Sequence, residues 1–199
     1  MLRLKTRLPA LLLCAAAFSF CSSAQANLVT NGGFETGDFT GWTQTGNTGF
    51  SGVQSLLLVP VHSGNFSAFF GPVGSLGGIS QNLVTIPGQL YVVDFWFLAD
   101  GATPSFFSAT FGGTTLTSQT NPAASSSFLE LAFLVTATSG TTALGFNFRN
   151  DPHFFLLDDV SVNQATPLPA ALPLFAGGLG VLGLLARRRK RKSAAAIAA

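Results

Sequence analysis

The sequence predicts an all-β fold, an antiparallel two-sheet jelly-roll sandwich, followed by one C-terminal transmembrane helix. Phenylalanine is unusually abundant, at 20 of 199 residues, and 22 glycines punctuate the chain. No segment between the two ends shows the sustained apolar period of 3.6 residues that a surface helix needs. By contrast, one uncharged stretch near the C-terminus is long enough to cross a bilayer.

The N-terminal segment is predicted to be a secretory signal peptide. Three basic residues lie within residues 1–7, and a 13-residue apolar stretch, 8–20, follows them. This stretch is too short to span a membrane, and Ala24-Gln25-Ala26 offers a small-x-small cleavage site. Residues 1–26 are therefore expected to be removed, leaving residues 27–164 as the exported domain.

Short apolar runs separated by turn signals predict the strands of that domain. Pro87-Gly88 marks a turn before the longest run, and Gly112-Gly113 marks a hairpin. Antiparallel strands at this spacing, with no crossover helix, indicate two packed sheets. The predicted strands are 28–30, 67–70, 78–84, 90–98, 106–111, 114–118, 128–136, 142–148 and 154–162.

Alternation assigns a core face to two of these strands. In the strand 90–98, the odd-numbered residues 91–97 are tyrosine, valine and phenylalanine and should point inward. In the strand 142–148, the even-numbered residues 144–148 are leucine and phenylalanine and should do the same.

The opposite faces of these two strands carry Asp94, Trp96, Asn147 and Arg149. If both faces belong to one sheet, the four side chains form a shallow patch of one aromatic ring with polar neighbours, a composition suited to sugar recognition. The alternative is that Trp96 packs under a loop and that Arg149 pairs with Asp94 or Asp151. The sequence leaves both interpretations open.

Charge separates the exported domain from the sorting segments. The formal net charge of the chain is +2, yet all eight acidic residues lie within 27–164, together with a single basic residue, Arg149. The domain is therefore about seven charges negative, which excludes nucleic acid as a partner. Both cysteines lie in the signal peptide, so the mature chain has no disulfide.

The C-terminal segment predicts a membrane anchor. Residues 168–186 carry no charge and would span about 28 Å as a helix. The positive-inside bias holds the cations that follow on the cytoplasmic side, so the domain before Leu168 lies on the far side. A short tail, 193–199, follows the cations, which are Arg187, Arg188, Arg189, Lys190, Arg191 and Lys192.

This tail resembles the PEP-CTERM sorting signal, with Pro167, Leu168, Pro169 and Ala170 in the place of its motif. The resemblance implies a Gram-negative bacterium, Sec-type export machinery, signal peptidase and recognition by an exosortase. It further implies an inner-membrane anchor before processing, then delivery to the cell surface or an extracellular matrix. Leu168 replaces the family's glutamate, which implies an exosortase specialised for the variant. A permanent, unprocessed anchor is the alternative.

The exported domain resembles the galactose-binding-like jelly roll of bacterial carbohydrate-binding modules. The segments that carry the resemblance are 27–35 (NLVTNGGFE), 40–42 (TGW), 79–81 (ISQ), 91–98 (YVVDFWFL) and 155–162 (FLLDDVSV). The resemblance implies a structural calcium ion where the first and last strands meet, at Glu35, Asp158 and Asp159. Trp42 follows a glycine in the segment that the family shows just after its first strand, and we interpret it as a packing residue rather than a ligand platform.

Alternation gives an independent reason to expect a cation at this place. Asp158 would share a face with Leu156, Val160 and Val162, so it should be buried and must then be paired, protonated or bound to metal. Calcium prefers hard oxygens, and the carbonyls of Gly32-Gly33 could add to the carboxylates. The alternative is that Asp158 accepts N–H bonds from the first loop.

Two non-catalytic functions fit the sequence. The preferred one is a structural surface or matrix protein, and the alternative is a carbohydrate-binding module that holds a polysaccharide through an outer β face or the loop 150–153. An enzyme is not expected, because neither His62 nor His153 stands in a metal-ligand or nucleophile motif.

Overall fold

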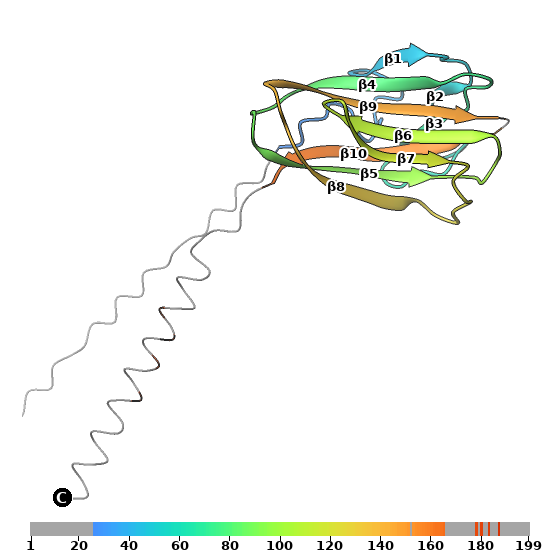
Figure 1. Ribbon diagram of the computed structural model, residues 1–199. Helices are drawn as coiled ribbons and strands as arrows, with labels where there is room; N and C mark the ends of the chain where they lie inside the picture. The colour runs from blue at the N-terminus through green and yellow to red at the C-terminus, as the bar shows by residue number, and fades with distance from the viewer. Residues whose placement is uncertain are drawn as a thin grey trace, which may run out of the picture.

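The computed structural model describes residues 26–151 and 153–165 and the isolated positions 178, 180, 183 and 187. The described residues form ten strands in two antiparallel sheets, so the predicted sandwich is confirmed (Figure 1). The strands are β1 (Thr43–Gly46), β2 (Ser51–Ser55), β3 (Phe66–Phe70), β4 (Gly77–Val84), β5 (Leu90–Leu98), β6 (Ser105–Phe111), β7 (Thr114–Thr120), β8 (Leu129–Thr136), β9 (Thr141–Asn150) and β10 (Phe155–Gln164).

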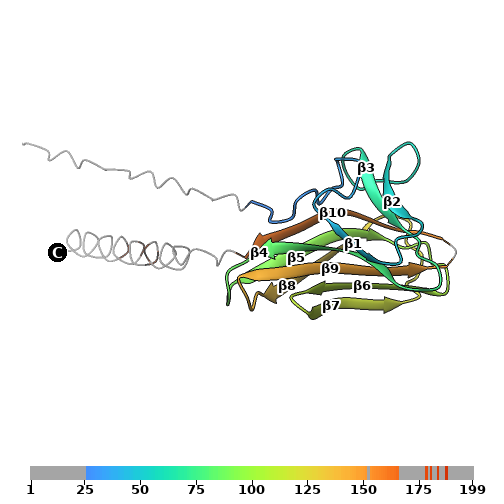
Figure 2. The same cartoon turned by 90° about the horizontal axis from the view of Figure 1, so that it is seen from above.

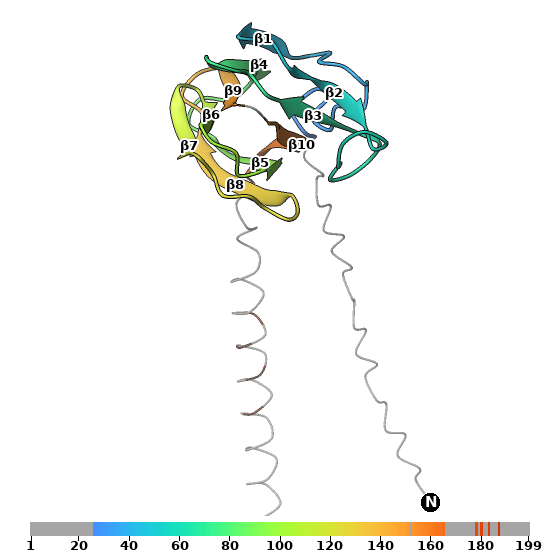
Figure 3. The ribbon, with the colours of Figure 1, turned by 90° about the vertical axis from the view of Figure 1, so that its right-hand side faces the viewer.

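Each sheet contains five strands. Sheet A has the order β1-β4-β9-β6-β7, and sheet B has the order β2-β3-β10-β5-β8. Most neighbours are not consecutive in the chain, so the backbone crosses repeatedly from one layer to the other. The end-on view shows the two curved layers facing each other across the core (Figure 3). β2 forms one edge of sheet B, and β2 and β3 stand at one border of the molecule (Figure 2).

Most predicted strands are present, and 90–98 has the predicted bounds. The segment 28–30 is not a strand, although Leu28 N–H donates to the Val162 carbonyl at 2.9 Å. β1 and β2 were not predicted, because TQTG and SGVQS contain a single apolar side chain between them and show no alternation. Their strand conformation comes from pairing with β4 and β3.

Phenylalanine rings from both sheets fill the core. Phe70 of β3 stacks on Phe148 of β9 with ring centroids 3.8 Å apart, and Phe97 of β5 stacks on Phe107 of β6 at 4.0 Å. The predicted inward residues of β5 and β9 are all buried, which confirms both face assignments. These stacks join the two sheets, because each pair takes one ring from either layer.

The alternation of β10 breaks at Asp158-Asp159. The pairing register with β5 shifts between Asp158 and Ser161, and Asp159 has a positive φ of 47°. This β-bulge adds one residue and turns the strand over. The prediction that Asp158 shares a face with Val160 is therefore wrong: Val160 enters the core, whereas Asp158 lies opposite Trp96 on the outer face of sheet B.

Both predicted sorting segments lie almost entirely outside the residues that the structure describes. Residues 1–25 lie outside the described residues, as does 168–186 apart from three isolated positions. Among the residues that are described, no helix is long and apolar enough to span a bilayer. The signal peptide and the membrane anchor thus remain predictions from the sequence.

Candidate functional site

The predicted four-residue sugar patch is wrong as a single surface. Asp94 and Trp96 lie on β5 in sheet B, whereas Asn147 and Arg149 lie on β9 in sheet A. Their outer faces point away from each other across the sandwich. Alternation placed each side chain on an outer face correctly, but it contains no information on which sheet a strand joins.

The sheet A half of the patch has a structural role. Arg149 donates from Nη2 and Nε to Oδ2 of Asp151 at 2.7 and 3.1 Å, which confirms one of the two pairings left open. Asp151 also accepts the N–H of Gly74, so the pair ties β9 to the β3–β4 loop. Asn147 donates to the Ser108 hydroxyl at 3.3 Å.

On sheet B, Trp96 lies beneath the loop that joins β2 to β3, residues 56–65. The imidazole of His62 stacks on the indole with ring centroids 3.6 Å apart and an interplanar angle of 11°. The interpretation that Trp96 packs under a loop is thus confirmed. Phe128, which precedes β8, approaches the same imidazole edge-on at 5.9 Å.

The bulge of β10 holds His62 in this position. Its Nδ1 lies 2.6 Å from Oδ2 of Asp159, and its backbone N–H donates to Oδ2 of Asp158 at 2.8 Å. The Ser63 hydroxyl donates to Oδ1 of Asp159 at 2.9 Å. The carboxylates of Asp158 and Asp159 therefore hold both the backbone and the imidazole of His62 in place.

Asp158 is fully buried, as the sequence predicted, but beneath the loop 56–65 rather than in the core. Burial raises its pKa to about 6, against the opposing effect of the N–H donors of His62 and Asp159. N–H groups thus satisfy this carboxylate, as the second interpretation proposed. They come from His62, Ser63 and Asp159, not from the first loop.

Glu35, Asp158 and Asp159 all border Gly33, where a Cβ would lie within 4 Å of each side chain. Glu35 accepts the N–H groups of Asn65 and Phe66 at 2.8 and 3.0 Å. The hard oxygens suit calcium chemically. However, within the described ranges no three acidic, histidine or cysteine side chains converge on a point that could hold an ion. Calcium therefore remains a prediction.

Asp94 stands beside Trp96 on the outer face of β5. Burial, and then the negative charge of Glu130 on β8, raise the pKa of Asp94. Its Oδ1 is buried and has no hydrogen-bond partner among the described residues. Asp94 therefore places this buried carboxyl oxygen beside Trp96.

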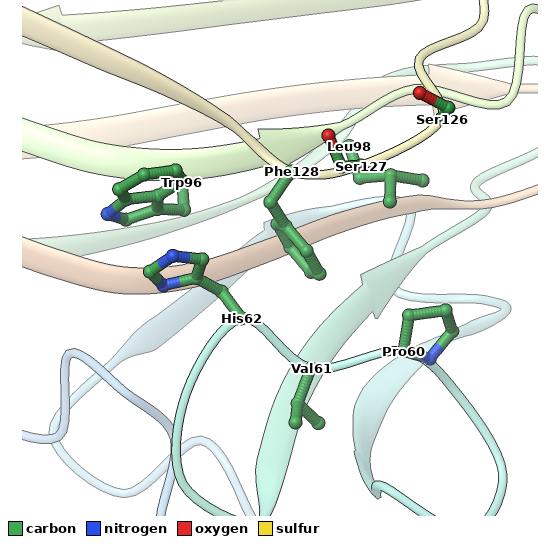
Figure 4. A pocket seen from close by; sticks show the side chains of 8 residues that line it. All are labelled: Pro60, Val61, His62, Trp96, Leu98, Ser126, Ser127 and Phe128. Atoms are coloured by element: carbon green, nitrogen blue, oxygen red, sulfur yellow. The ribbon is translucent and has the colours of Figure 1, made fainter.

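A pocket of about 450 Å³ opens beside the His62–Trp96 stack (Figure 4). It lies between two connections, the loop 56–65 and the segment 121–128 that precedes β8. Aromatic and aliphatic side chains form its walls, with two serines at one side. The lining residues are Pro60, Val61, His62, Trp96, Leu98, Ser126, Ser127 and Phe128.

Two other residues of the predicted sites prove to be buried, whereas His153 of the loop 150–153 is exposed. Trp42 is 8% exposed, stacks on Phe34 and donates Nε1–H to the Asn31 carbonyl, which confirms its role in packing. In the loop 150–153, Asn150 is buried and donates to Asp100 at 3.1 Å. Neither side chain is available to a polysaccharide.

Sequence reasoning found Trp96 and missed the rest of the pocket. Six of the eight lining residues belong to loops, which have no periodicity to interpret. The one available signal was the imidazole of His62 and the ring of Phe128, each in a connection between two strands.

No protein-family model matches the sequence, and no curated protein matches it. Solved structures do. TmCBM61, solved in complex with beta-1,4-galactotriose, is 18% identical with a TM-score of 0.56, over 70% of this chain and 99% of that chain. The CBM22-1 xylan-binding domain from Paenibacillus barcinonensis Xyn10C is 18% identical with a TM-score of 0.50, over 73% and 98%. A cyclase from Fischerella sp. TAU is 16% identical with a TM-score of 0.53, over 70% and 97%. At these identities the similarity shows a shared β-sandwich fold.

Proposed function

We propose that residues 27–164 form a non-catalytic carbohydrate-binding module that takes a saccharide in the pocket beside His62, Trp96 and Phe128. The observation that carries the proposal is this aromatic-walled pocket of about 450 Å³ on the outer face of sheet B. Its volume and its mixture of apolar walls and a few polar groups are typical of small-ligand sites.

The lining provides both kinds of contact that a sugar requires. The C–H face of a pyranose is apolar and packs on aromatic and aliphatic side chains, here Phe128, Val61 and Leu98. The sugar hydroxyls need hydrogen-bonding partners, and the exposed Ser126 and Ser127 offer them at the pocket's edge.

The pocket is also preorganised, which lowers the cost of ordering it on binding. Hydrogen bonds from His62 and Ser63 to the bulge carboxylates hold the loop 56–65, and the stack on Trp96 holds the imidazole. A ligand therefore meets a wall that is already in place.

The comparisons support this class of ligand. Two of the similar structures are described as a complex with galactotriose and as a xylan-binding domain, and each is covered almost completely by this chain. The exported domain thus has the size of such a module. The cyclase with the same fold shows that fold alone does not decide the matter, so the pocket must be tested.

The sorting segments place this module, in our proposal, at the cell surface or in an extracellular matrix of a Gram-negative bacterium. The signal peptide 1–26, the motif 167–170, the apolar segment 168–186 and the six cations after it support export and exosortase sorting. A polysaccharide of that surface is then the nearest ligand.

The test is saturable binding to glycans by the purified full chain in detergent. Galactan, xylan and the source organism's own exopolysaccharide are the probes. Phe128→Ala should weaken binding about tenfold or more, since buried aromatic side chains dominate binding sites and a factor of ten corresponds to about 1.4 kcal/mol.

Phe154→Ala is the matched control, because Phe154 is also a partly exposed ring but lies outside the pocket. It should bind like the wild type. If no glycan binds at any concentration, or if both variants bind equally well, the domain has the structural role and the pocket is not a sugar site.

A further inference from the structure

The end of the sandwich where the chain leaves β10 combines exposed apolar side chains with loops that contain no charged residue. We call it the exit end: the loops 85–89, 112–113 and 137–140, which lie on the left in Figure 1, together with Ala165. The Ala165 N–H donates to the Leu90 carbonyl at 2.8 Å. The loops 85–89 and 137–140 are joined by hydrogen bonds, Thr85 N–H to the Gly140 carbonyl and Gly88 N–H to the Ala137 carbonyl.

Large apolar side chains are exposed at this end. Val84 at the end of β4 is 81% exposed, Ile86 in the loop 85–89 is 54% exposed, and Leu90 at the start of β5 is 43% exposed. Leu134, at the same end of β8, is 64% exposed. Exposed apolar side chains also occur elsewhere on the domain, among them Leu57 at 91% and Phe50 at 68%, so exposure alone does not identify a contact surface.

The exit end is also uncharged. Its three loops contain no acidic or basic residue, although the domain carries eight carboxylates and one arginine. The opposite end carries Asp100 and Asp151 in the loops that follow β5 and β9. Negative charge is thus kept away from the point where the chain leaves.

The sequence after Ala165 indicates what the exit end contacts. Leu168, the first residue of the uncharged 19-residue segment, follows Ala165 by three residues, a reach of at most about 10 Å. If this segment enters a bilayer, the exit end lies within that distance of the lipid. Charge decides the orientation, because a domain with seven net negative charges is repelled by anionic lipid unless it turns an uncharged face to it.

We propose that the exit end rests on the lipid surface, with Val84, Ile86 and Leu90 inserted among the headgroups. The contact need not be strong by itself. A short tether gives the domain an effective concentration at the surface in the millimolar range, and stable interfacial binding usually combines two weak signals. This inference depends on the predicted membrane segment and not on the proposed glycan site.

The test uses the full chain, with Cys14 and Cys21 replaced by serine, in vesicles of phosphatidylethanolamine and anionic phosphatidylglycerol. A fluorescent label is attached to a Val84→Cys variant, and lipids brominated near the headgroup serve as the quencher. Val73→Cys is the matched control, because Val73 is also an exposed valine, at 48%, but lies in the loop 71–76 at the opposite end.

We expect brominated lipid to quench the Val84 label at least threefold more than the Val73 label. Equal quenching at the two sites would overturn the proposal. A Val84 label that is shielded from aqueous iodide but not quenched by brominated lipid would also overturn the proposal. In that case the residues 168–186, or a second copy of the chain, would cover the exit end. Failure of the chain to float with vesicles would remove the membrane segment and the proposal together, while leaving glycan binding unaffected.

Discussion

Asp94 is a carboxylate beside a second carboxylate, Glu130, and its pKa is raised by burial and by that neighbour. The folded state therefore binds a proton at Asp94 more tightly than the unfolded chain does. Its contribution to stability falls as the pH rises from the usual carboxyl value toward the folded-state pKa. We predict that Asp94→Asn raises the thermal midpoint at pH 7, and that the difference from wild type disappears below about pH 3.8.

Asp38 provides a control of opposite sign. The hydroxyls of Thr40 and Thr36 lower its pKa, so its ionised form stabilises the fold above the usual carboxyl value. Asp38→Asn should lower the midpoint at pH 7, and the difference from wild type should shrink only as the pH falls below about 3.8. Melting curves from pH 3 to 8 measure both variants. The same direction of change in both would contradict this account.

At the scale of elements, the loop 56–65 is held by carboxylates from two distant segments. Glu35 accepts the N–H of Asn65 at the end of this loop. Asp158 and Asp159 accept hydrogen bonds from His62 and Ser63 in its middle. If calcium also joins these groups, it must stabilise the folded state that binds it. We predict that the midpoint rises by several degrees from chelator to millimolar calcium, and that Glu35→Ala abolishes this shift. Glu130→Ala, at an exposed carboxylate outside the cluster, should keep it.

The diagnostic quantity is the calcium-dependent shift and not the midpoint itself. Glu35→Ala removes two backbone hydrogen bonds and lowers stability with or without an ion. A midpoint that does not change between chelator and calcium in the wild type would mean that N–H donors alone satisfy the cluster.

The strands joined by ring stacks should dominate stability. Phe148 is fully buried and stacks on Phe70 across the two sheets. Phe148→Ala should reduce the free energy of unfolding by about 3–5 kcal/mol, the usual cost of a large cavity in a core. Phe154→Ala, at a 41% exposed ring, should cost much less. Urea titration distinguishes the two, and equal losses would mean that the core relaxes around the cavity.

How much of an element the sequence could predict depended on how regularly its burial alternates. β5 alternates without interruption over Leu90–Leu98, and its bounds and faces were predicted. β1 and β2 are polar edge strands, and their conformation comes from pairing with β4 and β3. In β10, the bulge at Asp158-Asp159 reversed the faces, and no local pattern distinguishes a bulge from a regular strand.

At the scale of the whole molecule, the sequence did not predict which of the two sheets each strand joins. Trp96 and Arg149 each lie on an outer face as predicted, but on opposite layers, because strand order is set by contacts between distant segments. The pocket has the same origin. His62 reaches Trp96 only because the bulge of β10, almost one hundred residues later in the chain, binds its loop.

The orientation of the whole chain leads to one last prediction, on its two ends. The basic start with its cleavage site and the motif 167–170 predict that residues 1–26 are removed and that the segment after about Pro169 is cut. Intact-mass measurement of the protein recovered from cells should therefore give a chain that begins at Asn27 and ends near Pro169. Replacing the six cations with glutamine should leave the N-terminal cut and block the C-terminal one, because the segment would lose its orientation in the membrane. A chain recovered with residues 168–199 intact but 1–26 removed would identify a permanent anchor, and the exit end would then face lipid for the protein's whole lifetime.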